Sequence, residues 1–245
     1  MILPSPKDAL HKAMMYRMLI SILDNKNLSS NLYFKGGTCA AMLGFLDRFS
    51  IDLDFDLKKG ADKKEIRENL NIVFEDLNFT IKEQAKNELY YVLKYDAPKE
   101  IRNTLKLSII DKVIKTNIYK PQFLEEIKRY AICQTVETMF ANKLVAVTDR
   151  YKRYKTIAGR DLYDIHHFFI NGYGFNKKVI EERIGKTAEK YLTELINFIE
   201  KKFTVKQITE DLSYLLPPDK FKAIRKTLIA ETLSFLKSIS TLTPT

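Results

Sequence analysis

Cysteine is scarce in this chain: Cys39 and Cys133 are the only two among 245 residues, and they lie far apart in the sequence. Two cysteines are too few for a disulfide framework or a zinc knuckle, so we expect both to be ordinary buried residues. The sequence also lacks an apolar run of about 18 residues and a basic, then apolar, leader at its start. These absences argue against a membrane-spanning helix and a signal peptide, and we expect a cytoplasmic protein with no membrane partner.

The composition favours a folded, basic protein. Hydrophobic residues make up 45% of the chain, enough to build a packed core in one large domain or two modest ones. The formal net charge is +10, and six basic residues are concentrated between Asn142 and Asp161: Lys143, Arg150, Lys152, Arg153, Lys155 and Arg160. Such a segment attracts polyphosphate, nucleic acid or an acidic protein, or it is the solvated end of a basic helix.

The segment 34–57 has the most informative pattern. A short strand over 31–35, a turn at Gly36 and Gly37, a helix over 38–46 and a second strand are predicted in that order. In the second strand three aspartates alternate with three apolar residues, which places the carboxylates on one face and the apolar side chains on the other. The aspartates are Asp52, Asp54 and Asp56; the apolar residues are Leu53, Phe55 and Leu57.

A row of carboxylates repels itself unless a cation is bound to it, and a turn at a helix N-terminus favours a phosphate. Together the two features predict a site for a divalent metal ion and a nucleoside triphosphate. The pair Asp52 and Asp54 is expected to hold the metal, and Asp56 is expected to be either solvated or a support for that pair.

The remaining pattern predicts an α/β (α+β) protein. Its N-terminal half, 1–134, is expected to contain a mixed β-sheet with flanking helices, and its C-terminal half, 135–245, a helical bundle. Asp62 is a predicted N-cap. Further helices are predicted over 6–24, 62–77, 136–151, 160–170, 177–201, 208–214 and 219–238, and further strands over 79–84, 89–95, 104–110 and 130–133. The tail from Ser238 is expected to be disordered.

Two segments resemble one known family. KGGT…RFSIDLDF is similar to the signature of the AbiEii/AbiGii-type toxins, members of the DNA polymerase β-like nucleotidyltransferase superfamily. The later segment 137–165, ETMFANKLVAVTDRYKRYKTIAGRDLYDI, resembles that family's second block, a lysine-bearing helix followed by Arg-Asp-x-x-Asp. The resemblance implies a nucleotidyltransferase-like domain over 1–134 followed by the helical domain.

The resemblance also implies an activity and roles for single residues. The protein would be a Mg²⁺- or Mn²⁺-dependent transferase that moves a nucleoside monophosphate from an NTP to an acceptor hydroxyl, with tRNA or another RNA as the acceptor to test first and a cognate antitoxin as protein partner. Asp52 and Asp54 would bind the metal, and Lys143 and Asp161 would complete the catalytic set, Asp161 by orienting Lys143 or by contacting the nucleotide. The nucleotide would be bound by Gly36, Gly37, Thr38, Lys143 and Arg150, and Arg48 and Ser50 would either touch phosphate or orient the strand.

Departures from the superfamily leave alternatives open. Many related enzymes take a third carboxylate from a later strand, but the best candidate strand, 104–110, offers Lys106 and Ser108, and Asp111 follows late. An inactive nucleotide- or antitoxin-binding module therefore remains an alternative, as does an enzyme acting on a small molecule or a protein. Arg160 and Asp164, four residues apart, are expected to form a structural ion pair.

Overall fold

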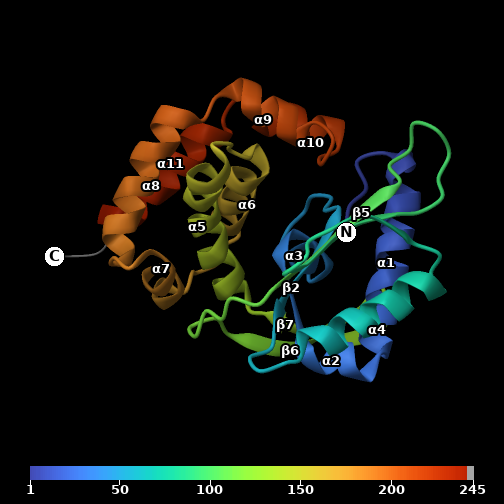
Figure 1. Ribbon diagram of the computed structural model, residues 1–245. Coiled ribbons are helices and arrows are strands. Elements are labelled where there is room, and N and C mark those ends of the chain that lie inside the picture. The colour runs from blue at the N-terminus through green and yellow to red at the C-terminus, as the bar shows by residue number, and fades with distance from the viewer. Residues whose placement is uncertain (242–245) are drawn as a thin grey trace. The chain divides into compact units, whose positions relative to one another are not determined.

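A computed structural model describes residues 1–241 of the chain (Figure 1). It contains two compact units: Met1–Val113 with Tyr119–Gln134, and Ile114–Ile118 with the chain from Thr135 onward. The α/β class is confirmed, because the first unit holds every strand of the described chain while the second is helical. In the described residues, no helix is both long and apolar enough to cross a membrane.

The first unit is built on a mixed seven-stranded sheet in the order β3-β4-β5-β2-β1-β7-β6. The central strand β2 pairs parallel with β5 and antiparallel with β1, and β1 pairs parallel with β7. The predicted mixed sheet is therefore confirmed. The strands are β1 (Leu32–Lys35), β2 (Asp52–Leu57), β3 (Thr80–Gln84), β4 (Leu89–Lys94), β5 (Thr104–Ile110), β6 (Tyr119–Leu124) and β7 (Arg129–Gln134).

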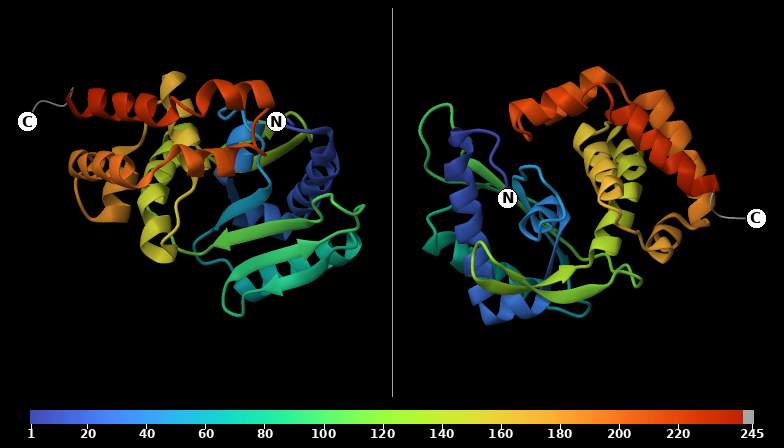
Figure 2. Two further views of the ribbon diagram at one scale, coloured as in Figure 1. Left: turned by 90° about the horizontal axis from the view of Figure 1, so that it is seen from above. Right: turned by 180° about the vertical axis from the view of Figure 1, so that it is seen from behind.

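Helix α1 packs against strands β2, β5 and β7, and the views in Figure 2 show α1 and α4 on one side of the sheet. The ring of Phe74 in α4 lies 5.1 Å from the ring of Tyr91, and Asp62 caps this helix by accepting from the N–H groups of Lys64 and Glu65, which confirms the predicted N-cap. The helices are η1 (Pro6–Asp8), α1 (Ala9–Asp24), α2 (Lys26–Asn31), α3 (Gly36–Met42) and α4 (Lys63–Asp76).

Strand β6 was not predicted. It contains Pro121, which cannot donate a ladder hydrogen bond, and β6 lies at the edge of the sheet, where a proline is tolerated. Its partner β7 was predicted to be shorter, over 130–133.

The second unit consists of helices α5 (Val136–Tyr154), α6 (Gly159–Ile170), α7 (Lys177–Ile184), α8 (Ala188–Lys202), α9 (Val205–Leu212), α10 (Pro218–Ile224) and α11 (Leu228–Thr241). The helix predicted over 177–201 is two helices, because Gly185 adopts φ +73° and ends α7. The helix predicted over 219–238 is likewise divided into α10 and α11. The predicted disorder from Ser238 is wrong for 238–241, which belong to α11, while 242–245 lie outside the described residues.

Candidate functional site

The aspartate row of β2 lies on one face of the sheet. Leu53 and Phe55 are fully buried on the other face, while Asp52 and Asp54 are half-buried. The Cα partners of these two aspartates in β5 are Lys106 and Ser108, and the partner of Asp54 in β1 is Lys35. β5 therefore contributes no carboxylate beside the pair, as the sequence suggested.

The glycine turn lies directly against this row. Gly36 has φ +80°, and a β-carbon added to it would lie 2.6 Å from Oδ2 of Asp54. A β-carbon at Gly37 would lie 2.9 Å from both Ser50 Oγ and Arg48 Nη2. Only glycine permits such close approach. Because α3 begins at Gly36, its first N–H groups have no partner within the helix and are suited to binding an anion.

Hydrogen bonds of the Thr38 hydroxyl link the glycine turn to the start of β2. Its side chain is fully buried, its hydroxyl donates to the backbone carbonyl of Asp52, and its Oγ1 lies 2.9 Å from Ser50 Oγ. Arg48 is also buried and donates from Nη1 to the carbonyl of Phe49 at 2.8 Å. These contacts favour the strand-orienting alternative for Arg48 and Ser50, and they show that the hydroxyl of Thr38 is engaged within the protein.

Asp56 is buried, so the expectation that it could be solvated is wrong. It is 6% exposed and accepts hydrogen bonds from Lys35 Nζ at 2.5 Å, Tyr119 Oη at 2.8 Å and Gln134 Nε2 at 2.8 Å. A buried carboxylate requires such donors to offset its lost hydration. Asp56 thus joins β2 to β1, β6 and β7.

His11 in α1 supports the site and was not singled out from the sequence. It is fully buried, with Nε2 2.8 Å from the carbonyl of Ile51, the residue before Asp52, and Nδ1 2.7 Å from Tyr95 Oη. Burial lowers the pKa of His11 below its ordinary value. Its helical spacing with the buried Met15 was the available sequence signal for burial.

In the second unit, α5 and α6 bring the residues of the second block together. Lys143 Nζ lies 3.1 Å from Asp161 Oδ1 and 2.8 Å from Asp164 Oδ2, and Arg150 Nε lies 3.1 Å from Asp161 Oδ2. Helical spacing predicted Arg160 as the partner of Asp164, whereas the ion pair found at Asp164 is with Lys143.

The two carboxylates of this cluster are buried, and the two cations are partly exposed. Asp161 is 1% exposed, whereas the side chains of Lys143 and Arg150 are 19% and 31% exposed. Burial acts to raise the pKa of Asp161, but the charges of Lys143, Arg150 and Arg160 together outweigh it and hold that pKa well below its ordinary value. Asp161 therefore stays ionised and fixes both cations.

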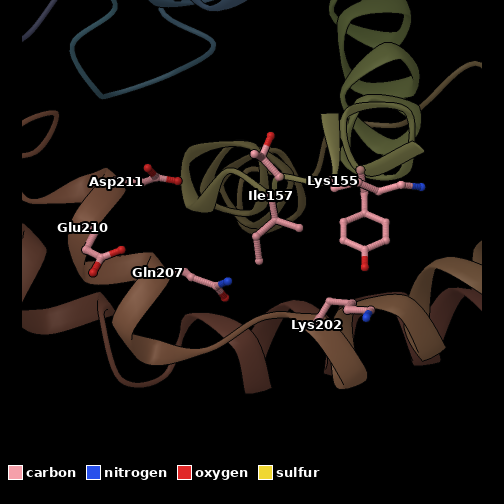
Figure 3. A pocket seen from close by; sticks show the side chains of 8 residues that line it. Lys155, Ile157, Lys202, Gln207, Glu210 and Asp211 are labelled. Atoms are coloured by element: carbon pink, nitrogen blue, oxygen red, sulfur yellow. The ribbon is translucent and has the colours of Figure 1, made fainter. Parts of the chain in front are cut away.

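A pocket of about 320 Å³ lies within the second unit, between the ends of α5 and α8 and the helix α9 (Figure 3). On one side, the Nζ atoms of Lys155 and Lys202 lie 5.6 Å and 5.1 Å from the centre of the Tyr151 ring. Glu210 and Asp211 lie on the other side, where Asp211 accepts from the N–H of Gly159 at 2.5 Å. Within the described chain neither lysine forms an ion pair with a carboxylate.

The donor chemistry of the β2 row fits a magnesium ion. Among the residues that the structure describes, no group of three or more His, Cys, Asp or Glu side chains is arranged to hold a metal. Mg²⁺, however, is commonly bound by one or two carboxylates and completes its coordination with substrate phosphates and water. Asp52 and Asp54 supply the two carboxylates, and the glycine turn beside Asp54 supplies N–H groups where phosphates would lie.

A known protein family matches most of the chain. The family model "Nucleotidyl transferase AbiEii toxin, Type IV TA system" matches residues 17–241. JHP933 from Helicobacter pylori is similar in structure with a TM-score of 0.60 and 21% identity, over 98% of this chain and 96% of that one. MenT4, a nucleotidyltransferase toxin from Mycobacterium tuberculosis, has a TM-score of 0.55 and 17% identity, over 94% of this chain and 84% of that one. At these identities the structural likeness shows the fold alone. No curated protein matches the chain.

Proposed function

Because the chain belongs to the AbiEii nucleotidyl transferase toxin family and is a nucleotidyltransferase, we propose that it transfers a nucleoside monophosphate from an NTP to an RNA hydroxyl and releases pyrophosphate. The acceptor proposed first is the end of a tRNA. The cation proposed at Asp52 and Asp54 is Mg²⁺, or Mn²⁺ in its place. The type IV toxin–antitoxin family implies an antitoxin partner, and the cytoplasm, where NTPs and RNA occur, is the proposed location.

The observation that carries this proposal is the contact between the glycine turn and the carboxylate pair. Gly36 lies against Asp54, so N–H groups suited to phosphate and oxygens suited to a metal are adjacent. When bound, the metal would neutralise triphosphate charge and polarise the attacking hydroxyl. Asp52 and Asp54 would hold the metal in place, and the N–H groups in the first turn of α3 would bind the phosphates.

Lys143 and Arg150 are proposed to bind phosphates of the triphosphate. Both are partly exposed, and both are oriented by the buried Asp161. An Arg and a Lys held this way present fixed positive charge without reorganisation at the moment of reaction, which is the condition for stabilising a transferring phosphoryl group.

The pocket beside Tyr151 supports RNA as the acceptor. The ammonium groups of Lys155 and Lys202 both lie near the ring of Tyr151, and neither forms an ion pair with a carboxylate in the described chain. Lys152 and Arg153 are exposed at the same end of α5. Unneutralised cations beside an aromatic ring are typical of surfaces that bind a phosphate backbone and stack a base.

This part of the proposal predicts that Lys155→Met with Lys202→Met weakens binding of tRNA and lowers the dependence of its affinity on salt. The matched control is Lys177→Met with Lys186→Met, which removes the same charge from lysines already paired with Glu189 and Glu194. Equal losses in the two double variants would show only a general effect of net charge and would contradict a specific RNA surface.

The activity is tested by measuring pyrophosphate release from each of the four NTPs in the presence of Mg²⁺ and total cellular RNA. Release that requires RNA and stops with EDTA is expected. Asp111→Asn serves as the control variant and should release pyrophosphate as wild type does. Asp111 is an exposed carboxylate just after β5 that pairs with Lys63. Release that is unaffected by removing RNA or by EDTA would contradict the proposal.

A second candidate function is a nucleotide-binding module without catalysis. The observation that favours it is the pair Lys106 and Ser108, which occupy the β5 positions beside Asp52 and Asp54. NTP binding by calorimetry, without pyrophosphate release for any acceptor, is the result that would select this candidate.

A further inference from the structure

The position of Lys35 raises a question about the charge of the carboxylate row. In the antiparallel register of β1 and β2, the direct partner of Lys35 is Asp54, and such partners have neighbouring side chains on the same face. Nevertheless, the ammonium of Lys35 pairs with Asp56, with Nζ 2.5 Å from Oδ1. Lys35 thus reaches diagonally past the residue directly opposite it.

The surroundings of Asp56 explain this choice. Its other carboxylate oxygen, Oδ2, accepts from both Tyr119 and Gln134, so the carboxylate is fixed in one orientation with Oδ1 turned toward Lys35. The side chains of Lys35 and Asp56 are only 16% and 9% exposed, which limits screening of their attraction by water. A fixed, buried carboxylate therefore competes better for the ammonium than the half-buried Asp54.

We propose that Asp56 is a positioning residue that holds the Lys35 ammonium at its own carboxylate and thereby keeps this ammonium from competing with a divalent cation for the oxygens of Asp52 and Asp54. The inference rests on the proposed metal site. An ammonium placed beside Asp54 would repel an incoming metal ion and occupy one of its oxygen ligands. Asp56 prevents this without contacting the metal itself.

The test is the dissociation constant for Mn²⁺, measured by electron paramagnetic resonance on the full chain without nucleotide. In Asp56→Asn the side chain no longer carries the charge that holds Lys35, and the Mn²⁺ dissociation constant is expected to rise about tenfold or more. Combining Asp56→Asn with Lys35→Met removes the released ammonium, and the dissociation constant is expected to return to within about threefold of the wild-type value. Asp111→Asn, which removes one exposed carboxylate from the same unit, is the control and should leave the constant unchanged.

The rescue separates positioning from a purely structural role. If Asp56 only stabilises the fold, the double variant will bind Mn²⁺ as weakly as Asp56→Asn or more weakly, and the inference is overturned. Lys35→Met alone keeps the Asp56 carboxylate and should bind Mn²⁺ at least as tightly as wild type; weaker binding overturns the inference even where Asp56→Asn fails to fold.

Failure of the metal site itself has a different signature. Wild-type protein that does not bind Mn²⁺, or Asp52→Asn that binds it as tightly as wild type, would refute both the proposed site and the inference. Binding that is lost in Asp52→Asn but unchanged in Asp56→Asn would refute the inference alone.

Discussion

A β-carbon at Gly36 would lie 2.6 Å from Oδ2 of Asp54. The glycine turn and the aspartate strand are therefore in contact with no room for a methyl group between them. Two sequence features that are individually common become one local structure, in which the start of a helix lies against a carboxylate pair.

Replacing Gly36 with alanine tests this contact. Gly36→Ala and Gly44→Ala both place a side chain at a positive φ, +80° and +77°, which costs about 1 kcal/mol in each case. Nothing lies within 4 Å of a β-carbon at Gly44, so only Gly36→Ala also displaces Asp54. We expect nucleotidyl transfer to fall much further in Gly36→Ala than in Gly44→Ala. Equal activity in the two variants would show that the close approach is unimportant.

The hydroxyl of Thr38 is expected to fix the start of β2. Thr38→Val keeps the shape but leaves the carbonyl of Asp52 without this donor, so the free energy of unfolding should fall by about 1–3 kcal/mol. Thr38→Ser keeps the hydroxyl and should retain most of the activity. Urea unfolding and pyrophosphate release measure the two effects. A Val variant as stable and active as the Ser variant would rule out this role.

Asp161 is expected to stabilise the second unit through its charge. Its pKa is lower in the folded chain than its ordinary value of 3.8, so its contribution is complete above that value and is lost as the pH falls toward the folded pKa. Asp161→Asn removes a buried partner of Lys143 and Arg150 and should cost about 3 kcal/mol at pH 7. Urea unfolding measures this, with the exposed Asp219→Asn as control. Wild-type stability in Asp161→Asn would contradict the account.

The stability of the first unit is also expected to depend on pH, through His11. Burial lowers its pKa below the ordinary 6.5, so the unfolded chain binds the proton more readily than the folded one. Stability from this group is complete above about pH 6.5 and declines as the pH falls toward the folded pKa. We expect the loss of stability between pH 7 and about 5.5 to be smaller in His11→Gln than in wild type. Identical pH profiles would show that His11 does not titrate in this range.

Local pattern accounts for what the sequence predicted well. The alternation of aspartates with Leu53 and Phe55 predicted the two faces of β2, and Asp62 predicted the start of α4, because both signals depend only on neighbours in the chain. The break between α7 and α8 at Gly185 was not predicted, because the apolar spacing continues across it although the backbone of Gly185 adopts a positive φ.

Long-range partners account for what was missed in the site. Asp56 is buried because Tyr119 and Gln134, 63 and 78 residues away, reach it from other strands. No local pattern in the chain encodes that meeting. His11 likewise acquires its role from the carbonyl of Ile51, 40 residues on. Asp52 and Asp54 could be proposed as a metal-binding pair from their motif, whereas the contacts that orient them could be seen only in the fold.

The most direct test of the central claim is transfer of label from α-labelled NTPs to RNA on a denaturing gel, comparing wild type with Asp52→Ala and Asp54→Ala in proteins shown by circular dichroism to be folded. The account predicts a labelled band of tRNA size with wild type and almost none with either variant. Full labelling by either folded variant would contradict the proposal that these two carboxylates hold the catalytic metal.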